Sequence, residues 1–260
     1  MTASRQNVFI SGAAAGIGLA TAQRFASAGW RVGVYDIDEA AAGAAARKLG
    51  GDALAGRLDV ADPTSWDAAL AAFTAITGGK LDVLVNNAGI MTTGPFETIP
   101  LATQLRIVDV NAKGVLAGCH AAFTYLRATP GARLVNLCSA SAIYGQPDMA
   151  TYSATKFFVR GLTEALEIEW RPFGIKVLAI WPLYVNTALV TDNPSTPAMG
   201  ALGVRLTAND VADVVFRAAT SKRGRRAHWP VGLQTRMTML GSHFGPPAVT
   251  RFVVAKLSRR

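Results

Sequence analysis

Tyr152 and Lys156 are the pair of residues whose types and spacing most directly suggest chemistry. They stand four residues apart in "YSATK", residues 152–156, with only small residues between them. On a helix this spacing puts both side chains on one face, about one turn apart, so a phenol and an ammonium group could meet. Taken alone, the stretch also fits an ordinary helix start with an exposed lysine and a half-buried tyrosine. The rest of the chain has to decide between the two interpretations.

A second candidate site lies in "SGAAAGIG", residues 11–18, directly after an apolar run. Gly12 would permit a tight turn, Gly16 would let the backbone approach a phosphate, and Gly18 would let a helix pack close to a sheet. The helix N-terminus would offer unpaired N–H groups to a pyrophosphate. Three glycines are weak evidence in a chain with 25 of them, but this place between a strand and a helix is the one that the mechanism requires.

Asp36 ends the next apolar run, eighteen residues after Gly18. A carboxylate here can accept hydrogen bonds from both ribose hydroxyls of an adenosine, and it would repel a 2′-phosphate. No lysine or arginine occurs at 37–40, and the glycine loop has only alanines between its first two glycines. The predicted cofactor is therefore NAD, with NADP as the less favoured choice. The alternative for Asp36 is a capping or solvated acid, although Asp38 is better placed to cap a helix.

The elements that must position these groups alternate between two patterns. Short apolar runs predict strands at 8–11, 31–35, 54–58, 81–85, 133–138, 175–181 and 227–231. Helical patterns between them predict helices at 16–28, 38–48, 64–76, 101–127, 152–171 and 207–220. Strands that are apolar on both faces and separated by helices are typical of a parallel sheet covered on both sides. We therefore predict an α/β fold: a single doubly wound, Rossmann-type domain with about seven parallel strands.

The charge of the chain is concentrated at its C-terminal end. The net charge is +9, but from Arg217 onward there are ten Lys and Arg and no Asp or Glu, which leaves residues 1–216 at −1. No motif of aromatic and basic residues accompanies this charge, so no specific nucleic-acid partner is predicted. The composition, 50% hydrophobic and 17% charged, is typical of a globular core and excludes a disordered chain.

The cysteines and histidines predict no metal site. Cys119 and Cys138 lie in apolar stretches without metal-ligand spacing, and His120, His228 and His243 are scattered. We expect reduced thiols and structural histidines. No signal peptide is recognised, and no apolar run approaches the roughly 20 residues that span a bilayer, so a soluble cytoplasmic protein is expected.

Four further motifs stand in register with the two described above. They are "LDV" at 58–60, "NNAG" at 86–89, "NAKG" at 111–114 and "NLCSASAIYG" at 136–145. Together, the six motifs have the order and spacing of the short-chain dehydrogenase/reductase family. The chain resembles this family over nearly its whole length, up to about residue 232.

The resemblance implies a catalytic role for four residues. Tyr152 would be the proton donor or acceptor, with Lys156 as its activator. Ser139 would hold the substrate oxygen, and Asn111 would interrupt its helix and seat a water that continues the proton path. A phenol of pKa near 10 needs a fall of about 3 units, or about 4 kcal/mol, to act as a base near neutral pH. We expect the lysine and the positive nicotinamide ring to supply that field.

The resemblance also implies a set of cofactor-binding residues. Asp59 and Val60 would line the adenine pocket, Asn87 and Ala88 would lie beside the ribose, and a third segment would hold the carboxamide. The full set is Gly12, Gly16, Ile17, Gly18, Asp36, Asp59, Val60, Asn87, Ala88, Tyr152, Lys156, Val185 and Thr187.

Two positions depart from the family's pattern. Leu183, in "WPLYVNT" at 181–187, stands where the family usually has glycine, and Cys138 stands where a second serine is common. The leucine puts a side chain near the nicotinamide, and the cysteine is expected to be a small buried residue.

Segments that border the nicotinamide in relatives suggest an apolar pocket with few charges. Its candidate residues are Met91, Ile143, Tyr144, Met149, Leu183 and Tyr184. The predicted function is therefore an NAD-dependent oxidoreductase that interconverts a hydrophobic secondary alcohol and a ketone. The alternatives are an NADP-dependent carbonyl reductase and a non-catalytic nucleotide-binding relative.

The composition predicts the domain and the tail, and the resemblance implies an assembly. Residues 1–245 would form the NAD-binding catalytic domain, with a substrate loop at 188–206. The helices at 101–127 and 152–171 would form the subunit contacts of a tetramer or dimer. Residues 246–260 would form a basic C-terminal helix or tail.

Within that tail, Val249, Phe252, Val253 and Leu257 gather on one side of a helix, with Arg251 opposite. The tail could pack on its own subunit, cover the pocket, contact another subunit, or bind an anionic membrane weakly.

Overall fold

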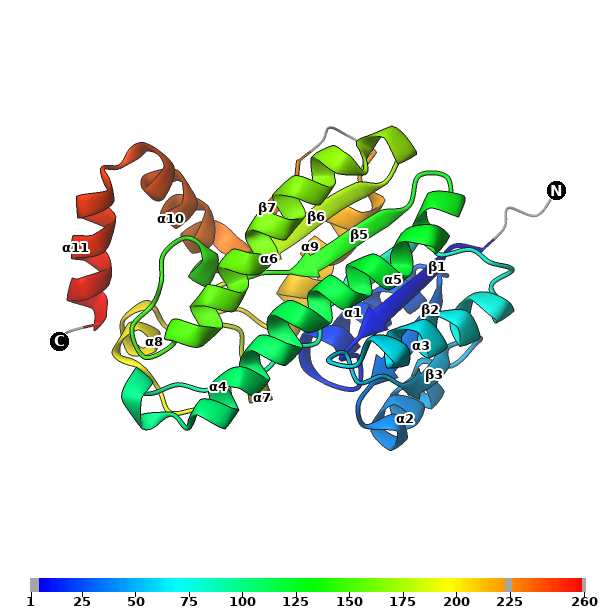
Figure 1. The fold of residues 1–260 in the computed structure, drawn as a ribbon, viewed down its shortest axis with the longest axis horizontal. Helices are drawn as coiled ribbons and strands as arrows, with labels where there is room; N and C mark the ends of the chain where they lie inside the picture. The colour runs from blue at the N-terminus through cyan, green and yellow to red at the C-terminus, as the bar shows by residue number, and fades with distance from the viewer. Residues whose placement is uncertain (1–4, 223–225, 259–260) are drawn as a thin grey trace.

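A parallel β-sheet organises the chain (Figure 1). The computed structural model describes residues 5–222 and 226–258. Within them the strands are β1 (Asn7–Ser11), β2 (Arg31–Asp36), β3 (Leu54–Arg57), β4 (Val83–Asn86), β5 (Arg133–Leu137), β6 (Lys176–Trp181) and β7 (His228–Pro230). They stand in the order β3-β2-β1-β4-β5-β6-β7, and every neighbouring pair is parallel. This confirms the predicted seven-stranded α/β fold.

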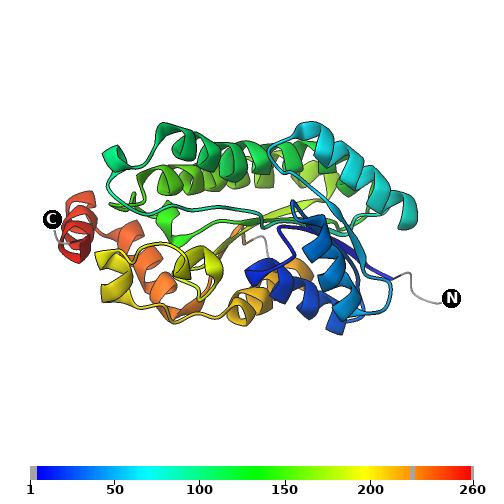
Figure 2. The same ribbon diagram turned by 90° about the horizontal axis from the view of Figure 1, so that it is seen from below.

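Helices cover both faces of the sheet (Figure 2). In the described residues they are α1 (Gly16–Ser27), α2 (Glu39–Leu49), α3 (Pro63–Ile76), α4 (Leu101–Val108), α5 (Gly114–Ala128), α6 (Ala150–Glu169), α7 (Ala188–Thr191), α8 (Pro197–Leu202), α9 (Ala208–Thr220), α10 (Gly232–Phe244) and α11 (Pro247–Ser258). Buried residues of α1, α2 and α9 join one core cluster, and those of α3, α5 and α6 join the other. The sheet is therefore doubly wound.

The strand β1 shows why the strands of this sheet are apolar on both faces. Val8 and Ile10 are buried in the core cluster on one side, and Phe9, between them, is buried in the other. Side chains alternate across a strand, so a sheet covered on both faces needs apolar residues at every position. Phe9 stacks on Tyr35 of β2, with 4.1 Å between ring centroids.

The helices α2 and α3 are each capped by an aspartate. Asp38 caps α2 through a 2.9 Å hydrogen bond from the Ala41 N–H, so the capping role belongs to Asp38 as predicted. Asp62 caps α3 through the Thr64 N–H, with Pro63 as the first helical residue.

The helix predicted at 101–127 is interrupted by a π-turn, Asp109–Lys113, which contains Asn111, where the resemblance implied an interruption. Two other segments differ from the expectation. The loop at 188–206, expected to be irregular, contains α7 and α8. The helix α10 was not predicted, because its apolar residues do not follow one buried face. No helix of the described ranges is long and apolar enough to cross a bilayer.

Part of the basic end lies outside the described residues. This applies to Arg223, Arg225, Arg259 and Arg260, and the side chain of His243 also lies outside the description.

Candidate active site

A cleft of about 530 Å³ opens at the carboxyl ends of the central strands, where β1 and β4 are neighbours. The strand order reverses here, because β2 and β3 lie on one side of β1 whereas β4 to β7 lie on the other. Open α/β sheets bind their ligands at such switch points. The cleft is lined by all the predicted site residues except Gly18 and Asn111, namely Gly12, Gly16, Ile17, Asp36, Asp59, Val60, Asn87, Ala88, Ser139, Tyr152, Lys156, Val185 and Thr187. The fold thus brings together residues from seven separate segments of the sequence.

The glycine loop leaves no room for side chains at two positions. Gly12 has a φ of +64°, and a Cβ there would lie 2.7 Å from the Ala88 Cα. A Cβ on Gly18 would collide with the carbonyl oxygen of Gly12 and lie 2.6 Å from the Asn87 side-chain nitrogen. The close packing of α1 against this loop therefore requires glycine at both positions.

Polar groups around the loop are held in place by the backbone. Asn87 Nδ2 donates to the carbonyl oxygens of Ser11, at 3.0 Å, and Gly12, at 2.8 Å. Asp36 Oδ2 accepts from the Ala14 N–H at 3.0 Å. The carboxylate of Asp36 lines the cleft and is fixed against the glycine loop, as a ribose-binding acid needs to be.

Arg106 of α4 is a cleft residue that the sequence did not reveal. Its Nη2 lies 3.8 Å from Oδ1 of Asp59, in the part of the cleft that Val60 also lines. The two charged residues are 47 positions apart in the sequence, and no local pattern connects them.

Thr187 lies across the cleft from the glycine loop. A Cβ built on Gly16 would stand 3.6 Å from Cγ2 of Thr187. Val185 forms an isolated parallel bridge with Leu206, which fixes the start of this segment.

Tyr152 and Lys156 lie one turn apart near the start of α6, as predicted. Lys156 Nζ is 5.5 Å from the centroid of the Tyr152 ring and donates a 2.8 Å hydrogen bond to the Leu137 carbonyl. The lysine is 5% exposed. An ammonium with three donors keeps two of them for other partners in the cleft.

Burial governs the pKa values of both groups. Burial raises the pKa of Tyr152 well above its ordinary value of 10.0, and a hydrogen bond from Ser139 opposes the rise. Burial also lowers the pKa of Lys156 below its ordinary value of 10.5. The fall expected at Tyr152 requires the positive nicotinamide ring as well as the lysine, so it stays a prediction for the protein with its cofactor bound.

Ser139 occupies the turn that follows β5. It is 6% exposed, and its Oγ accepts from the Ser141 N–H at 3.1 Å, which caps the 3-10 turn Ala140–Ala142. The Ser139 Oγ also donates to the Ser141 Oγ at 3.2 Å. The serine thus satisfies groups of its own turn, and because it lines the cleft its hydroxyl can rotate to donate to a substrate oxygen.

Asn111 lies behind the cleft, inside the π-turn. Its Oδ1 accepts from the Ile90 N–H and its Nδ2 donates to the Ile90 carbonyl, both at 2.8 Å. The amide also lies 3.4 Å from Thr155 Oγ1 of α6. The side chain therefore connects the segment after β4 to the helix that carries Lys156.

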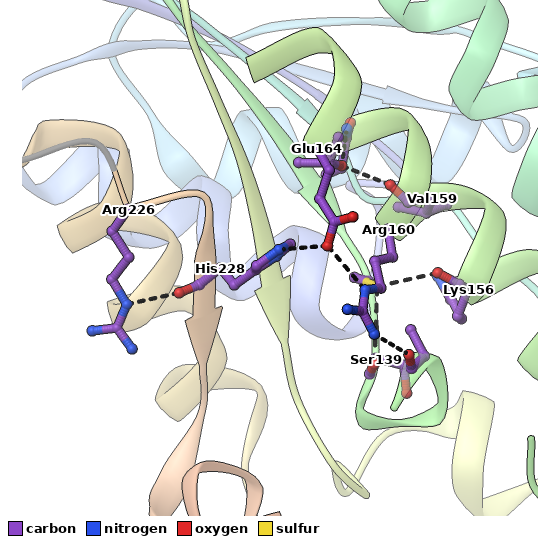
Figure 3. Close-up of polar contacts among 11 residues, drawn as sticks. Ser139, Lys156, Val159, Arg160, Glu164, Arg226 and His228 are labelled. Atoms are coloured by element: carbon purple, nitrogen blue, oxygen red, sulfur yellow. Dashed lines mark hydrogen bonds and ion pairs between the residues drawn. The ribbon is translucent and has the colours of Figure 1, made fainter. Parts of the chain in front are cut away.

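Arg160, Glu164 and His228 form a polar network behind the Ser139 turn (Figure 3). Glu164 Oε1 accepts from Arg160 Nε at 2.9 Å and lies 2.9 Å from His228 Nε2. Arg160 Nη1 also donates to the Ala142 carbonyl at 3.3 Å. The network ties α6 and β7 to the turn that follows Ser139.

The two cysteines are buried free thiols. Burial raises the pKa of Cys119 to about 12 and that of Cys138 to about 11. Both sulfurs are therefore poor nucleophiles. Within the described ranges, no group of three or more His, Cys, Asp or Glu residues is arranged to hold a metal ion.

The substrate side of the cleft is apolar. Met91, Met149, Tyr184 and Met199 form a buried cluster, against which Leu183 packs. The Tyr184 hydroxyl lies 2.9 Å from Gln146 Oε1 and donates to it.

Two of the predicted pocket residues do not line the cleft. Ile143 packs instead against the core cluster below α6, and Tyr144 lies outside the lining. Met199 does not line the cleft but packs in the cluster behind the lining residues Met91, Met149 and Tyr184; it was not predicted because the segment that forms α8 was expected to be irregular.

The residues of the cleft fit a dinucleotide. Ala15, Gly16 and Ile17 open the N-terminus of α1 to the cleft, where unpaired N–H groups favour a phosphate. The missing side chains of the glycine loop leave the backbone accessible, and Asp36 stands at the end of β2. This donor set suits a pyrophosphate followed by an adenosine ribose.

The comparison with protein families agrees with this geometry. The family model described as "short chain dehydrogenase" matches residues 6–198. The chain belongs to the short-chain dehydrogenase family. It is therefore an oxidoreductase of the type that acts on CH–OH groups, and the family match and the NADH and NADP complexes of similar structures support a nicotinamide cofactor.

Relatives and solved structures of this family are similar over most of the chain. A 3-alpha-(or 20-beta)-hydroxysteroid dehydrogenase of Mycobacterium tuberculosis is 35% identical over 82% of each chain. A D-threitol dehydrogenase of Mycolicibacterium smegmatis is 36% identical over 69% of this chain and 70% of that one.

The structure of a 3-ketoacyl-(acyl-carrier-protein) reductase from Brucella melitensis complexed with NADH has a TM-score of 0.79 at 30% identity, covering 87% of this chain and 96% of that one. A gluconate 5-dehydrogenase from Burkholderia cenocepacia in complex with NADP and tartrate has a TM-score of 0.78 at 27% identity, covering 89% and 95%. Similar folds thus hold either dinucleotide.

Proposed function

We propose that this short-chain dehydrogenase uses NAD to interconvert an uncharged, hydrophobic secondary alcohol and the corresponding ketone. The observation that carries the proposal is the composition of the cleft. The carboxylate of Asp36 is fixed at the nucleotide end, and the methionine-rich cluster lies beside Tyr152 at the other. A hydroxysteroid dehydrogenase among the relatives acts, by its name, on a hydrophobic alcohol.

Asp36 supports NAD over NADP. Its side chain lines the cleft, and Ile37, which follows it, is 51% exposed and uncharged. A 2′-phosphate placed here would meet a carboxylate without a compensating cation from the adjacent residues.

In the proposed mechanism the protein moves the proton, and a bound nicotinamide would supply the hydride chemistry. The Tyr152 oxygen takes the proton of the alcohol or returns it to the ketone. The high pKa of the phenol makes Tyr152 a proton donor in the described arrangement. For alcohol oxidation, the Lys156 ammonium has to stabilise the ionised form of the Tyr152 phenol, in addition to its hydrogen bond to the Leu137 carbonyl.

Ser139 and Asn111 assist this proton transfer. Ser139 Oγ can donate to the substrate oxygen, whose charge changes in the transition state. Asn111 holds the Ile90 segment against α6 and would seat the water that continues the path from Lys156.

A homo-oligomer, tetramer or dimer, is also part of the proposal. Exposed apolar residues gather on α4, α5 and α6, namely Leu101, Leu105, Leu116, Phe157, Phe158 and Ile168. Contact between copies through these helices would bury them and stiffen the helix that carries Tyr152.

A screen of hydrophobic secondary alcohols with NAD and NADP tests the proposal. We expect the absorbance of the reduced cofactor to rise with NAD, and Tyr152→Phe to bind NAD while losing about 10²-fold to 10⁴-fold in rate. Turnover of Tyr152→Phe within a few fold of wild type, or a preference for NADP, would contradict it.

A further inference from the structure

The helix α10 turns its largest apolar residues outward. Leu233, Met237 and Leu240 follow one another at spacings of four and three residues, so they share one face. They are between 57% and 72% exposed. The inward side carries Thr235, which is buried, and Met239, which packs on the core cluster that contains Val159 of α6. A surface helix of a soluble monomer normally buries its large apolar residues and exposes its polar ones.

The helix α11 repeats this arrangement. Val249, Phe252 and Val253 are between 46% and 68% exposed. The helix contacts α8, and its buried residue is Ser258, with Leu257 half-buried beside it. Leu257 was expected on the apolar side and instead lies toward the body of the protein. The helix therefore packs on its own subunit and still leaves an apolar face uncovered.

The charged residues of these two helices are all positive. Arg236, Arg251 and Lys256 are exposed on α10 and α11, and the sequence contains no acidic residue after Asp213. By helical spacing, Lys256 lies among the exposed apolar residues of α11 and Arg251 lies on the opposite side. An apolar surface bordered by cations matches the chemistry of an anionic lipid surface, where apolar side chains enter the acyl boundary and cations meet the headgroups.

The exposed apolar face on α4, α5 and α6 has a different charge pattern. Its ion pairs Lys113–Asp109, Arg160–Glu164 and Arg171–Glu167 place both signs on the surface. A mixed surface can meet a second copy of itself with opposite charges paired. An isologous contact through α10 and α11 would instead bring cations against cations. The charge pattern therefore favours lipid over a second copy at α10 and α11.

The position of the two helices links them to the substrate pocket. Figure 1 shows α10 and α11 at one end of the molecule, with α8 beside α11. The α8 residue Met199 belongs to the apolar cluster that lines the substrate side of the cleft. The family match ends at residue 198, so both helices lie beyond it.

We propose that α10 and α11 dock the protein on an anionic membrane surface. Docking there places the α8 side of the substrate pocket toward the bilayer, where hydrophobic alcohols and ketones dissolve. The docking surface is independent of the chemistry proposed for the cleft, so its test needs no turnover.

Co-sedimentation with vesicles tests the proposal on the full chain. Wild type is mixed with vesicles of phosphatidylglycerol and phosphatidylcholine, or of phosphatidylcholine alone, at low salt and at about 0.5 M NaCl. One variant carries Leu233→Ser, Met237→Ser and Phe252→Ser, and a second carries Arg236→Gln, Arg251→Gln and Lys256→Gln. We expect wild type to bind the anionic vesicles at low salt, and each variant to lose at least about tenfold in bound-to-free ratio.

A matched control carries Ile76→Ser and Phe96→Ser, which are 57% and 60% exposed on other parts of the surface. It should bind as wild type does, and the glutamine variant should keep the wild-type melting temperature. Absence of wild-type binding, equal binding by all four proteins, or equal losses in the control would overturn the proposal. A fall in the solution mass of the serine variant, with unchanged lipid binding, would assign the surface to a second copy instead.

Discussion

The two sides of the cleft are built in different ways. On the nucleotide side, the backbone fixes the site, because a Cβ at Gly12 or Gly18 would meet neighbouring atoms at less than contact distance. Asn87 and Asp36 are hydrogen-bonded to that same backbone. On the substrate side, the lining is a cluster of methionines and tyrosines that packs without such contacts to the loop.

This difference predicts how each side responds to substitution. A rigid backbone contact has few alternatives, so a single added methyl group must displace it. Methionine side chains are flexible and fill space in several ways, so an apolar lining can change while its volume is kept. We therefore expect the nucleotide side to be sensitive and the substrate side to be tolerant.

The largest effect is expected for Gly18→Ala. The added Cβ collides with the Gly12 carbonyl, so α1 has to move away from the glycine loop, where we propose that the pyrophosphate binds. Isothermal titration should show NAD binding weakened by at least about tenfold, or about 1.4 kcal/mol. Gly161→Ala is the matched control, since a Cβ there meets no atom within 4 Å. Normal NAD binding by Gly18→Ala would show that the backbone contact is not needed.

The next effect concerns Asp36. Replacing it with Ala and placing Arg at Ile37 removes the carboxylate that repels a 2′-phosphate and adds a cation. We expect the kcat/KM ratio of NAD to NADP to fall by at least about tenfold, equal to about 1.4 kcal/mol. The single variant Ile37→Gln serves as a control and should keep the preference for NAD. An unchanged ratio in the double variant would remove Asp36 from cofactor choice.

A smaller effect is expected on the substrate side. Met199→Leu keeps the volume of the apolar cluster, so it should change kcat/KM for a hydrophobic alcohol by less than about tenfold, or about 1.5 kcal/mol. The Kd for NAD should stay as in wild type. A loss as large as that of Gly18→Ala would show that both sides of the cleft are equally rigid.

The smallest effect belongs to the network of His228, behind the cleft. Burial lowers its pKa from the ordinary 6.5, reinforced by Arg160 and Arg226, while Glu164 opposes the fall. The unfolded chain then binds a proton at higher pH than the folded protein does. The free energy of unfolding should therefore fall as the pH drops through about 6.5, and level off below the folded-state pKa.

Urea unfolding at several pH values measures this dependence. We expect wild type to lose more stability than His228→Gln between about pH 8 and about pH 5. Parallel curves for the two proteins would show that the histidine does not titrate differently in the folded state.

The same difference between the two sides explains what the sequence could predict. Gly12, Gly18 and Asp36 could be predicted because the geometry at these positions allows few residue types. Tyr152 and Lys156 could be predicted because helical spacing alone puts them on one face.

The remaining features depend on contacts between distant segments. Arg106 meets Asp59 only after folding, and Met199 packs against Met91, Met149 and Tyr184 only because the 188–206 segment forms α8. The hydrogen bond from Lys156 to the Leu137 carbonyl joins residues 19 positions apart and likewise has no local signature. Apolar packing accepts many residue types, so it leaves a weaker pattern in the sequence.

The most direct test of the account follows one hydrogen atom. Hydrophobic secondary alcohols carrying deuterium on the carbinol carbon are incubated with the protein and NAD, and the reduced cofactor is analysed by mass spectrometry. The account predicts that the deuterium moves to the nicotinamide with wild type, and that transfer is nearly lost with Tyr152→Phe although NAD still binds. Reduced cofactor without the label, or equal transfer by Tyr152→Phe, would contradict it.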